Sequence, residues 1–255
     1  MTYEGKVVIL TGAGGGIASA MARKFASLGA SLALLDIAEE PVKKLAAQLA
    51  LPADRVMTAA ADVSDEDSVR RTVEKVREYF GRIDVLVNTA GIPGPSARVQ
   101  DYSYADCRRV FEVNVFGTFL MMKYVLPVMQ AQKKGAVLNI GSVSGMVGYP
   151  YESAYGASKA AIIHLTKNAA SENGGNGVRI NCLSPGWVNT AMMKTIVDSY
   201  VDVGIADTSE NVTLGPMGRP GEPAEMAEVA AFLCSDDASY VNGSNWLADG
   251  GMTLG

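Results

Sequence analysis

A glycine cluster placed directly after a continuous apolar run is the feature that most constrains the fold of this chain. The run at 6–11 shows no alternation of polar residues, which is typical of a parallel strand covered on both faces. It breaks into Gly12–Gly16, and an apolar helical pattern follows over 17–28. A tight glycine turn that opens a helix lets backbone N–H groups face the diphosphate of a dinucleotide. The sequence therefore predicts a dinucleotide-binding unit at its start.

Strands and helices alternate along the rest of the chain. Further strands are predicted at 31–35, 55–61, 83–87, 136–140, 178–183 and 244–248, and helices at 39–49, 65–80, 104–132, 154–171 and 223–234. This rhythm predicts an α/β fold with one doubly wound parallel sheet of about seven strands, a Rossmann fold, in a single domain spanning 1–255. Residues 190–216 are expected to form a small substrate lobe. Ser64 is expected to cap the helix at 65–80, and Pro127 to bend the helix at 104–132.

A tyrosine and a lysine lie four residues apart in the helix at 154–171. This spacing puts Tyr155 and Lys159 on one helix face, and Ser142 ends the strand before them. A free phenol titrates near pH ~10, and lowering its pKa to about 7 requires about 4 kcal/mol. One cation at about 4 Å supplies about that much at an effective dielectric constant near 20. The pair therefore suits acid/base chemistry, although Tyr-x-x-x-Lys taken alone is a common pattern.

Asp36 closes the second predicted strand, where a dinucleotide would place its adenosine ribose. A carboxylate there accepts hydrogen bonds from ribose hydroxyls and repels a 2′-phosphate. Neither Ile37 nor residues 13–15 supply a positive charge that would offset this repulsion. The sequence thus predicts NAD rather than NADP as cofactor.

Composition and charge exclude several classes of function. The formal net charge of −5 disfavours a nucleic-acid or anionic-membrane partner, and no secretory signal or apolar run of spanning length is evident. Cys107, Cys182 and Cys234 show no metal-ligand spacing, and His164 is the one histidine, so no metal site is predicted. Reduced, scattered cysteines favour a cytoplasmic protein.

These motifs together resemble the short-chain dehydrogenase/reductase family over essentially the whole chain. Residues 11–18 resemble the family turn T-G-x-x-x-G-I-G, with Ala18 in place of the last glycine. Residues 88–91 resemble N-N-A-G, with Thr89 in place of the second asparagine. Asn114, Ser142, Tyr155 and Lys159 match the catalytic Asn-Ser-Tyr-Lys set in order and spacing.

The resemblance implies a role for each matched residue. Tyr155 would be the general acid/base, Ser142 would orient the substrate oxygen, Lys159 would lower the pKa of Tyr155 and bind the nicotinamide ribose, and Asn114 would position a water in a proton relay. The cofactor would contact Gly12, Gly14, Gly15, Gly16, Ile17, Asp36, Ile37, Asp62, Val63, Asn88, Ala90, Gly91, Tyr155, Lys159, Pro185, Gly186, Val188 and Thr190.

The expected reaction is hydride transfer between nicotinamide and a secondary alcohol or ketone. Candidate substrate residues are Ser142, Ser144, Tyr149 and Trp187, with Tyr151, Met192 and Met193 as further candidates. The residues at 190–216 are poor in basic side chains, which favours a neutral alcohol, polyol or sugar-like small molecule. An NADPH-linked 3-oxoacyl thioester reductase and a non-catalytic nucleotide-binding scaffold are the alternatives.

Two predicted helices, 104–132 and 154–170, carry apolar or small residues nearly all the way round. A helix on the surface of a monomer should present one polar face to solvent. A second buried face implies contact with another subunit, so a homo-oligomer is expected. A tetramer rather than a dimer is what the family resemblance implies.

Overall fold

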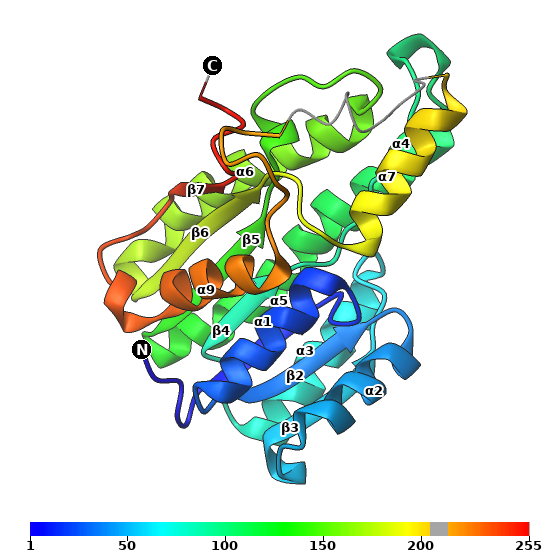
Figure 1. Cartoon of the computed structure of the whole chain (residues 1–255). Helices are drawn as coiled ribbons and strands as arrows, with labels where there is room; N and C mark the ends of the chain where they lie inside the picture. Colours follow the sequence, from blue (N-terminus) through cyan, green and yellow to red (C-terminus); the bar gives the residue numbers. More distant parts are fainter. Residues whose placement is uncertain (205–213, 255) are drawn as a thin grey trace.

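A seven-stranded parallel sheet forms the centre of the molecule (Figure 1). The computed structural model describes residues 1–204 and 214–254. The strands are β1 (Val7–Thr11), β2 (Ser31–Asp36), β3 (Val56–Ala60), β4 (Val85–Asn88), β5 (Gly135–Ile140), β6 (Val178–Pro185) and β7 (Asn245–Ala248). Their order in the sheet is β3-β2-β1-β4-β5-β6-β7, and every neighbouring pair is parallel. The predicted doubly wound α/β fold is confirmed.

Helices cover both faces of the sheet. The helices of the described residues are α1 (Gly16–Ser27), α2 (Glu39–Leu49), α3 (Glu66–Phe80), α4 (Tyr104–Phe111), α5 (Gly117–Gln132), α6 (Ser153–Asn173), α7 (Ala191–Asp202) and α9 (Pro223–Cys234). One face packs against α1, α2 and α9, and the other against α3, α5 and α6 (Figure 1). Burial on both faces explains why β1 and β4 read as continuous apolar runs.

The chain changes direction across the sheet between β1 and β4. From β1 it winds outward through β2 to β3, and it returns to place β4 on the other side of β1. The crevice beyond the carboxyl ends of β1 and β4 is therefore the topological switch point, where ligands bind in folds of this kind. The substrate lobe is described only in part, because 205–213 of the predicted 190–216 lie outside the described residues.

One local prediction needs correction. Asp65 rather than Ser64 caps α3: its carboxylate accepts a hydrogen bond from the backbone N–H of Ser68 at 2.6 Å, whereas the Ser64 hydroxyl donates to Asp62. The predicted long helix at 104–132 is interrupted by the π-helical turn Glu112–Phe116 between α4 and α5. Pro127 lies inside α5, and the bend expected there stays a prediction.

Residues 104–132 are long and apolar enough to cross a membrane by length and composition, contrary to the sequence-based expectation that no such run exists. Their apolar side chains have another explanation in this fold. Leu120, Met121, Val125 and Met129 of α5 are buried against the sheet and α3. About half of the most apolar window is buried inside the molecule, as in a core helix.

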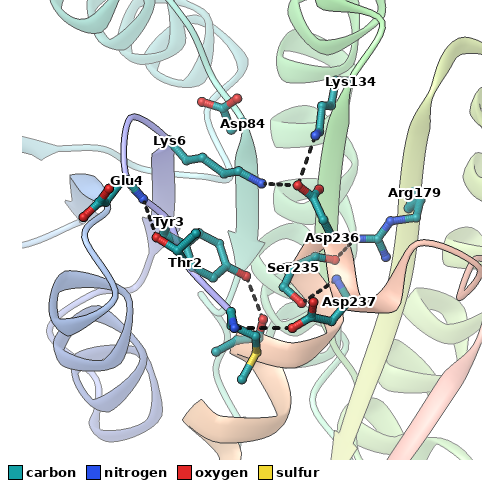
Figure 2. A network of polar contacts seen from close by, with 12 residues as sticks. Thr2, Tyr3, Glu4, Lys6, Asp84, Lys134, Arg179, Ser235, Asp236 and Asp237 are labelled. Atoms are coloured by element: carbon teal, nitrogen blue, oxygen red, sulfur yellow. Dashed lines mark hydrogen bonds and ion pairs between the residues drawn. The ribbon is translucent and has the colours of Figure 1, made fainter.

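The N-terminal residues contact the end of α9 and the short turn that follows it (Figure 2). The Tyr3 ring is fully buried edge-on against Phe25, and its hydroxyl donates to the Ala231 carbonyl at 2.7 Å. Beside it, the exposed Asp236 carboxylate pairs with the ammonium groups of Lys6 and Lys134, each at 3.1 Å. The buried aromatic group contributes more to stability than the exposed ion pairs, because solvent screens the latter.

The difference between the buried ring and the exposed ion pairs predicts how substitutions change the free energy of unfolding. Tyr3→Ala should lower the free energy of unfolding by about 3–5 kcal/mol, because it empties a fully buried site. Tyr3→Phe should cost about 1 kcal/mol through the lost hydrogen bond. The matched control Asp236→Asn should change it by less than about 1 kcal/mol. Urea denaturation measures all three, and an Asp236→Asn loss as large as that of Tyr3→Ala would contradict this account.

Candidate active site

A cavity at the carboxyl ends of β1, β4, β5 and β6 gathers most of the predicted site. The predicted residues that line it are Gly12, Gly15, Gly16, Ile17, Gly91, Ser142, Ser144, Tyr149, Tyr155, Lys159, Pro185, Gly186, Trp187, Val188 and Thr190. Met192, Met193 and Ile196 of α7 close it from the side of the lobe. Tyr151 does not line the cavity; it has a left-handed backbone (φ 68°), and the Arg98 guanidinium lies over its ring.

Tyr155 and Lys159 lie one turn apart on α6, as their spacing predicts. Lys159 is buried, and its ammonium donates a hydrogen bond to the Ile140 carbonyl, at the end of β5, at 2.8 Å. Its nitrogen lies over the Tyr155 ring, 5.6 Å from the centroid. Burial lowers the pKa of Lys159 to about 8. The amine is thus held at the floor of the cavity by a strand-end carbonyl.

The pKa of Tyr155 differs from the sequence-based expectation. Burial, reinforced by the negative charge of Glu152, raises it to about 12, and a hydrogen bond with the Ser142 side chain opposes that rise. The Lys159 amine lies over the face of the ring, and burial weakens its own charged form. Within the chain itself, burial therefore dominates, and the phenol is protonated at neutral pH. The lowering of this pKa by Lys159 stays a prediction.

Asn114 is fully buried in the π-helical turn, and its side chain uses both polar atoms. The amide oxygen accepts from the Ile92 N–H at 2.8 Å, and the amide nitrogen donates to the Ile92 carbonyl at 3.0 Å and to the Ser158 hydroxyl at 2.9 Å. A methyl group on Gly91 would lie 3.2 Å from the Asn114 oxygen and 3.6 Å from the Lys159 nitrogen. Asn114 and Lys159 therefore flank the same glycine at the end of β4.

The glycine turn has little room for side chains. Gly12 adopts a left-handed conformation (φ 60°), and a methyl group there would approach the Ala90 Cα to 2.9 Å. A methyl group on Gly16 would lie 2.9 Å from the Thr190 side chain. Glycine at these positions keeps the turn close to β4 and to the segment after β6. The backbone N–H groups at the start of α1 can therefore face a bound anion.

Asp36 is fixed at the end of β2 by two backbone donors. The Gly14 N–H donates to one carboxylate oxygen at 3.0 Å, and the Ala38 N–H donates to the other at 3.2 Å. Each oxygen keeps a further lone pair for a ligand hydroxyl. The neighbouring Ile37 side chain is exposed and uncharged.

The remaining predicted cofactor residues lie at the same sheet edge but outside the cavity. Val63 is buried beneath Gly117, Asp62 accepts from Ser64, and the Asn88 amide donates to Asn139 at 2.9 Å beneath the switch point. The other predicted cofactor residues that do not line the cavity are Gly14, Asp36, Ile37 and Ala90.

The cavity fits a ligand that carries a diphosphate and ribose hydroxyls. The Thr89 hydroxyl is buried at its wall and has no hydrogen-bond partner among the described residues. The Thr11 hydroxyl accepts from the N–H groups of Thr89 and Ala90, at 3.1 Å each, and so fixes this wall. An unpaired buried hydroxyl, a glycine cradle and a fixed carboxylate are the features that a dinucleotide would use. No group of three metal-ligating side chains occurs within 1–204 and 214–254.

Sequence reasoning missed Glu152, whose carboxylate lines the cavity beside Ser144. It accepts a hydrogen bond from the Ser144 hydroxyl at 2.7 Å and another from the Tyr200 hydroxyl at 2.5 Å. The available signal was an acidic residue three positions before Tyr155 in an otherwise uncharged stretch, 142–158. Its contact with α7 could not be read from spacing, because 48 residues separate Tyr200 from Glu152.

The fold and this cavity define an α/β oxidoreductase of the Tyr-x-x-x-Lys type. The comparisons agree: a family model described as enoyl-(acyl carrier protein) reductase matches residues 12–253. Meso-2,3-butanediol dehydrogenase of Serratia marcescens is 41% identical over 253 residues, which cover 99% of this chain and 96% of that relative. The chain therefore belongs to the short-chain dehydrogenase/reductase family, as its motifs indicate.

Two further relatives show the range of activities among similar proteins. A crystal structure of NAD⁺-bound xylitol dehydrogenase matches with a TM-score of 0.94 and 37% identity, covering 98% of this chain and all of that one. The 3-oxoacyl-(acyl-carrier-protein) reductase of Thermotoga maritima is 36% identical over 254 residues, which cover 100% of both chains. These similar proteins share the family but act on different substrates.

The buried amine predicts a pH-dependent stability. The pKa of Lys159 is about 8 in the folded chain against an ordinary 10.5, so the unfolded chain binds more protons between these values. The cost of burying the ammonium is fully present below pH 8 and disappears as the pH rises to 10.5. Lys159→Met removes that cost. Its stability relative to wild type should therefore fall by up to about 3 kcal/mol between pH 7 and 10.5.

Urea unfolding at pH 7, 8, 9 and 10 measures this difference. Lys194→Met, at an exposed lysine of α7, is the matched control and should show a flat difference over the same range. A flat profile for Lys159→Met as well would show that the amine is not held in a desolvated position.

Proposed function

We propose that the chain is an NAD-dependent oxidoreductase that transfers a hydride between nicotinamide and a neutral secondary alcohol or ketone. The observation that carries this proposal is that Ser142, Tyr155 and Lys159 line one cavity with the glycine turn. Bound NAD would supply the hydride acceptor for alcohol oxidation, and with it a positive charge beside the phenol.

The side chains of the cavity divide the proton chemistry between them. In ketone reduction, the protonated Tyr155 phenol donates its proton to the carbonyl oxygen, and a pKa of about 12 keeps that proton in place at neutral pH. In alcohol oxidation the phenolate accepts the alcohol proton, which requires positive charge nearby to lower this pKa. Ser142 hydrogen-bonds the same oxygen and orients it. Lys159 would bind the ribose hydroxyls of the nicotinamide cofactor, and Asn114 beside it would position a water that connects the amine to solvent.

Removing the phenolic hydroxyl tests the enzymatic proposal against a non-catalytic scaffold. Tyr155→Phe should lower kcat about 10²–10⁴-fold for every alcohol in a panel, because the proton has no other acceptor in place. NADH binding, followed by the shift in melting temperature, should persist. Turnover by wild type is monitored at the absorbance band of the reduced cofactor. Binding without turnover by wild type across the panel would support the scaffold, whereas equal turnover by both proteins would exclude Tyr155 as the acid/base group.

Asp36 supports NAD over NADP. Its carboxylate, held by the N–H groups of Gly14 and Ala38, would accept from ribose hydroxyls and repel a 2′-phosphate. Wild type should bind NADH more tightly than NADPH. Asp36→Ala should narrow the ratio of the two dissociation constants by about tenfold or more, which corresponds to about 1.4 kcal/mol.

Titration of cofactor fluorescence measures both dissociation constants. Glu39→Ala, at an exposed carboxylate at the start of α2, is the matched control and should leave the ratio unchanged. A preference of wild type for NADPH would favour the NADPH-linked 3-oxoacyl thioester reductase instead.

The charges around the cavity support a neutral substrate over an anionic thioester. Of the described residues that line it, only Glu152 and Lys159 are charged, and Lys159 lies at the floor. An anionic substrate would meet the Glu152 carboxylate, and among the described lining residues only Lys159 carries a positive charge. A polyol or a sugar-like alcohol meets no such repulsion.

Exposed aromatic side chains support assembly with further copies of the chain. Tyr104, Phe116 and Phe119 are exposed along α4, the π-helical turn and α5, and Trp246 and Leu247 are exposed on the edge strand β7. Apolar surface on two separate elements is what an oligomer with two kinds of interface, such as a homotetramer, would bury. Free thiols at Cys107, Cys182 and Cys234 support a cytoplasmic location.

A further inference from the structure

Glu152 presents a rigidly held carboxylate to the substrate side of the cavity. Its two donors come from separate elements: Ser144 lies in the short 3₁₀ turn Val143–Gly145, and Tyr200 lies on α7. Tyr200 is itself buried behind Glu152 and does not line the cavity. Glu152 is therefore clamped between the loop after β5 and the substrate lobe, with its oxygens fixed in direction.

The carboxylate keeps capacity for a ligand. Two carboxylate oxygens offer about four lone-pair positions, and the Ser144 and Tyr200 hydroxyls occupy two of them. Within the part of the chain that the structure describes, no basic side chain pairs with Glu152. Burial raises the pKa values of Tyr149, Tyr155 and Tyr200, and the negative charge of Glu152 raises all three further. An unpaired charge of this kind is positioned to accept from a polar group of the substrate.

We propose that Glu152 determines substrate specificity by accepting a hydrogen bond from a second hydroxyl, on the carbon next to the one that is oxidised. The reacting oxygen belongs at Ser142 and Tyr155. The Ser144 N–H donates to the Ser142 hydroxyl at 3.2 Å, and the Ser144 hydroxyl donates to Glu152 at 2.7 Å, so the two positions adjoin along one wall. The substrate class is then a vicinal diol or a polyol. This inference rests on the function proposed above.

Charge distinguishes this class from two others that carry a polar group at the same position. A hydroxy acid would bring its carboxylate against Glu152 and be repelled. A protonated amino alcohol would be attracted to Glu152, but it would enter a cavity that already holds the Lys159 amine and that would hold the positive charge of oxidised nicotinamide. A neutral hydroxyl donor satisfies the free lone pairs without either conflict.

The test compares 2,3-butanediol with 2-butanol, which differ only in the second hydroxyl. Wild type with NAD should show a kcat/KM at least about 30-fold higher for the diol. Glu152→Gln should lower this ratio about tenfold, because a charged acceptor forms a stronger hydrogen bond than a neutral amide. Any effect of the charge on the pKa of Tyr155 acts on both substrates and cancels in the ratio. Wild type should reject 3-hydroxybutyrate, and Glu152→Gln should gain activity toward it.

Two further variants test whether the change in the kcat/KM ratio is specific to Glu152. Asp198→Asn, at an exposed carboxylate of α7 that does not line the cavity, is the matched control and should keep the wild-type ratio. Tyr200→Phe removes one of the two hydroxyls that hold Glu152. It should lower the ratio by a smaller factor, through KM for the diol rather than kcat. Melting temperature and NADH affinity establish that each variant is folded and binds cofactor.

The outcomes separate this inference from the proposed function. No turnover of either alcohol by wild type would overturn the proposed function and, with it, the role of Glu152. Turnover of both alcohols with similar kcat/KM, or a ratio unchanged in Glu152→Gln but lost in Tyr149→Phe, would overturn the role of Glu152 alone. Wild type could instead turn over 3-amino-2-butanol faster than the diol, with this preference lost in Glu152→Gln. That result would show that the carboxylate binds a cationic group of the substrate rather than a hydroxyl.

Discussion

The site depends on a buried amine that a strand-end carbonyl holds in place. Lys159 donates to the Ile140 carbonyl at the carboxyl end of β5 and is almost fully excluded from solvent. Desolvation destabilises the charged form of Lys159, so the lysine does not favour this buried position by itself. The packing of neighbouring elements must therefore hold it there. α6 supplies that packing, because it runs along the sheet with Tyr155 one turn before Lys159.

The parallel sheet explains why groups distant in sequence meet here. The carboxyl ends of β1, β4, β5 and β6 share one edge, and each ends in a residue or loop that the cavity uses. A buried polar chain runs beneath it, in which Asn88 donates to Asn139 and Asn139 donates to Thr166 of α6 at 2.9 Å. Hydrogen bonds between core side chains connect β4, β5 and α6, and so fix the position of α6 relative to the sheet.

The electrostatics of the cavity come from neighbours rather than from the Tyr-Lys pair alone. Burial and the charge of Glu152 keep the Tyr155 phenol protonated, which suits an acid in ketone reduction. The same carboxylate holds Tyr200 and thereby ties α7 to the loop before α6. One side chain thus connects the lobe that would select the substrate with the helix that carries the acid/base group. Glu152 would thus affect both the choice of substrate and the protonation of Tyr155.

The sequence by itself determined the features that depend on local spacing. The apolar run before Gly12–Gly16, the carboxylate at Asp36 and the four-residue step from Tyr155 to Lys159 were sufficient to predict the fold and most of the cavity wall. Only the tertiary structure decided the strand order, the partners of Asn114, the clamp on Glu152 and the direction of the Tyr155 pKa shift. Each of these depends on burial and on contacts between residues far apart in the chain, which periodicity and spacing do not encode.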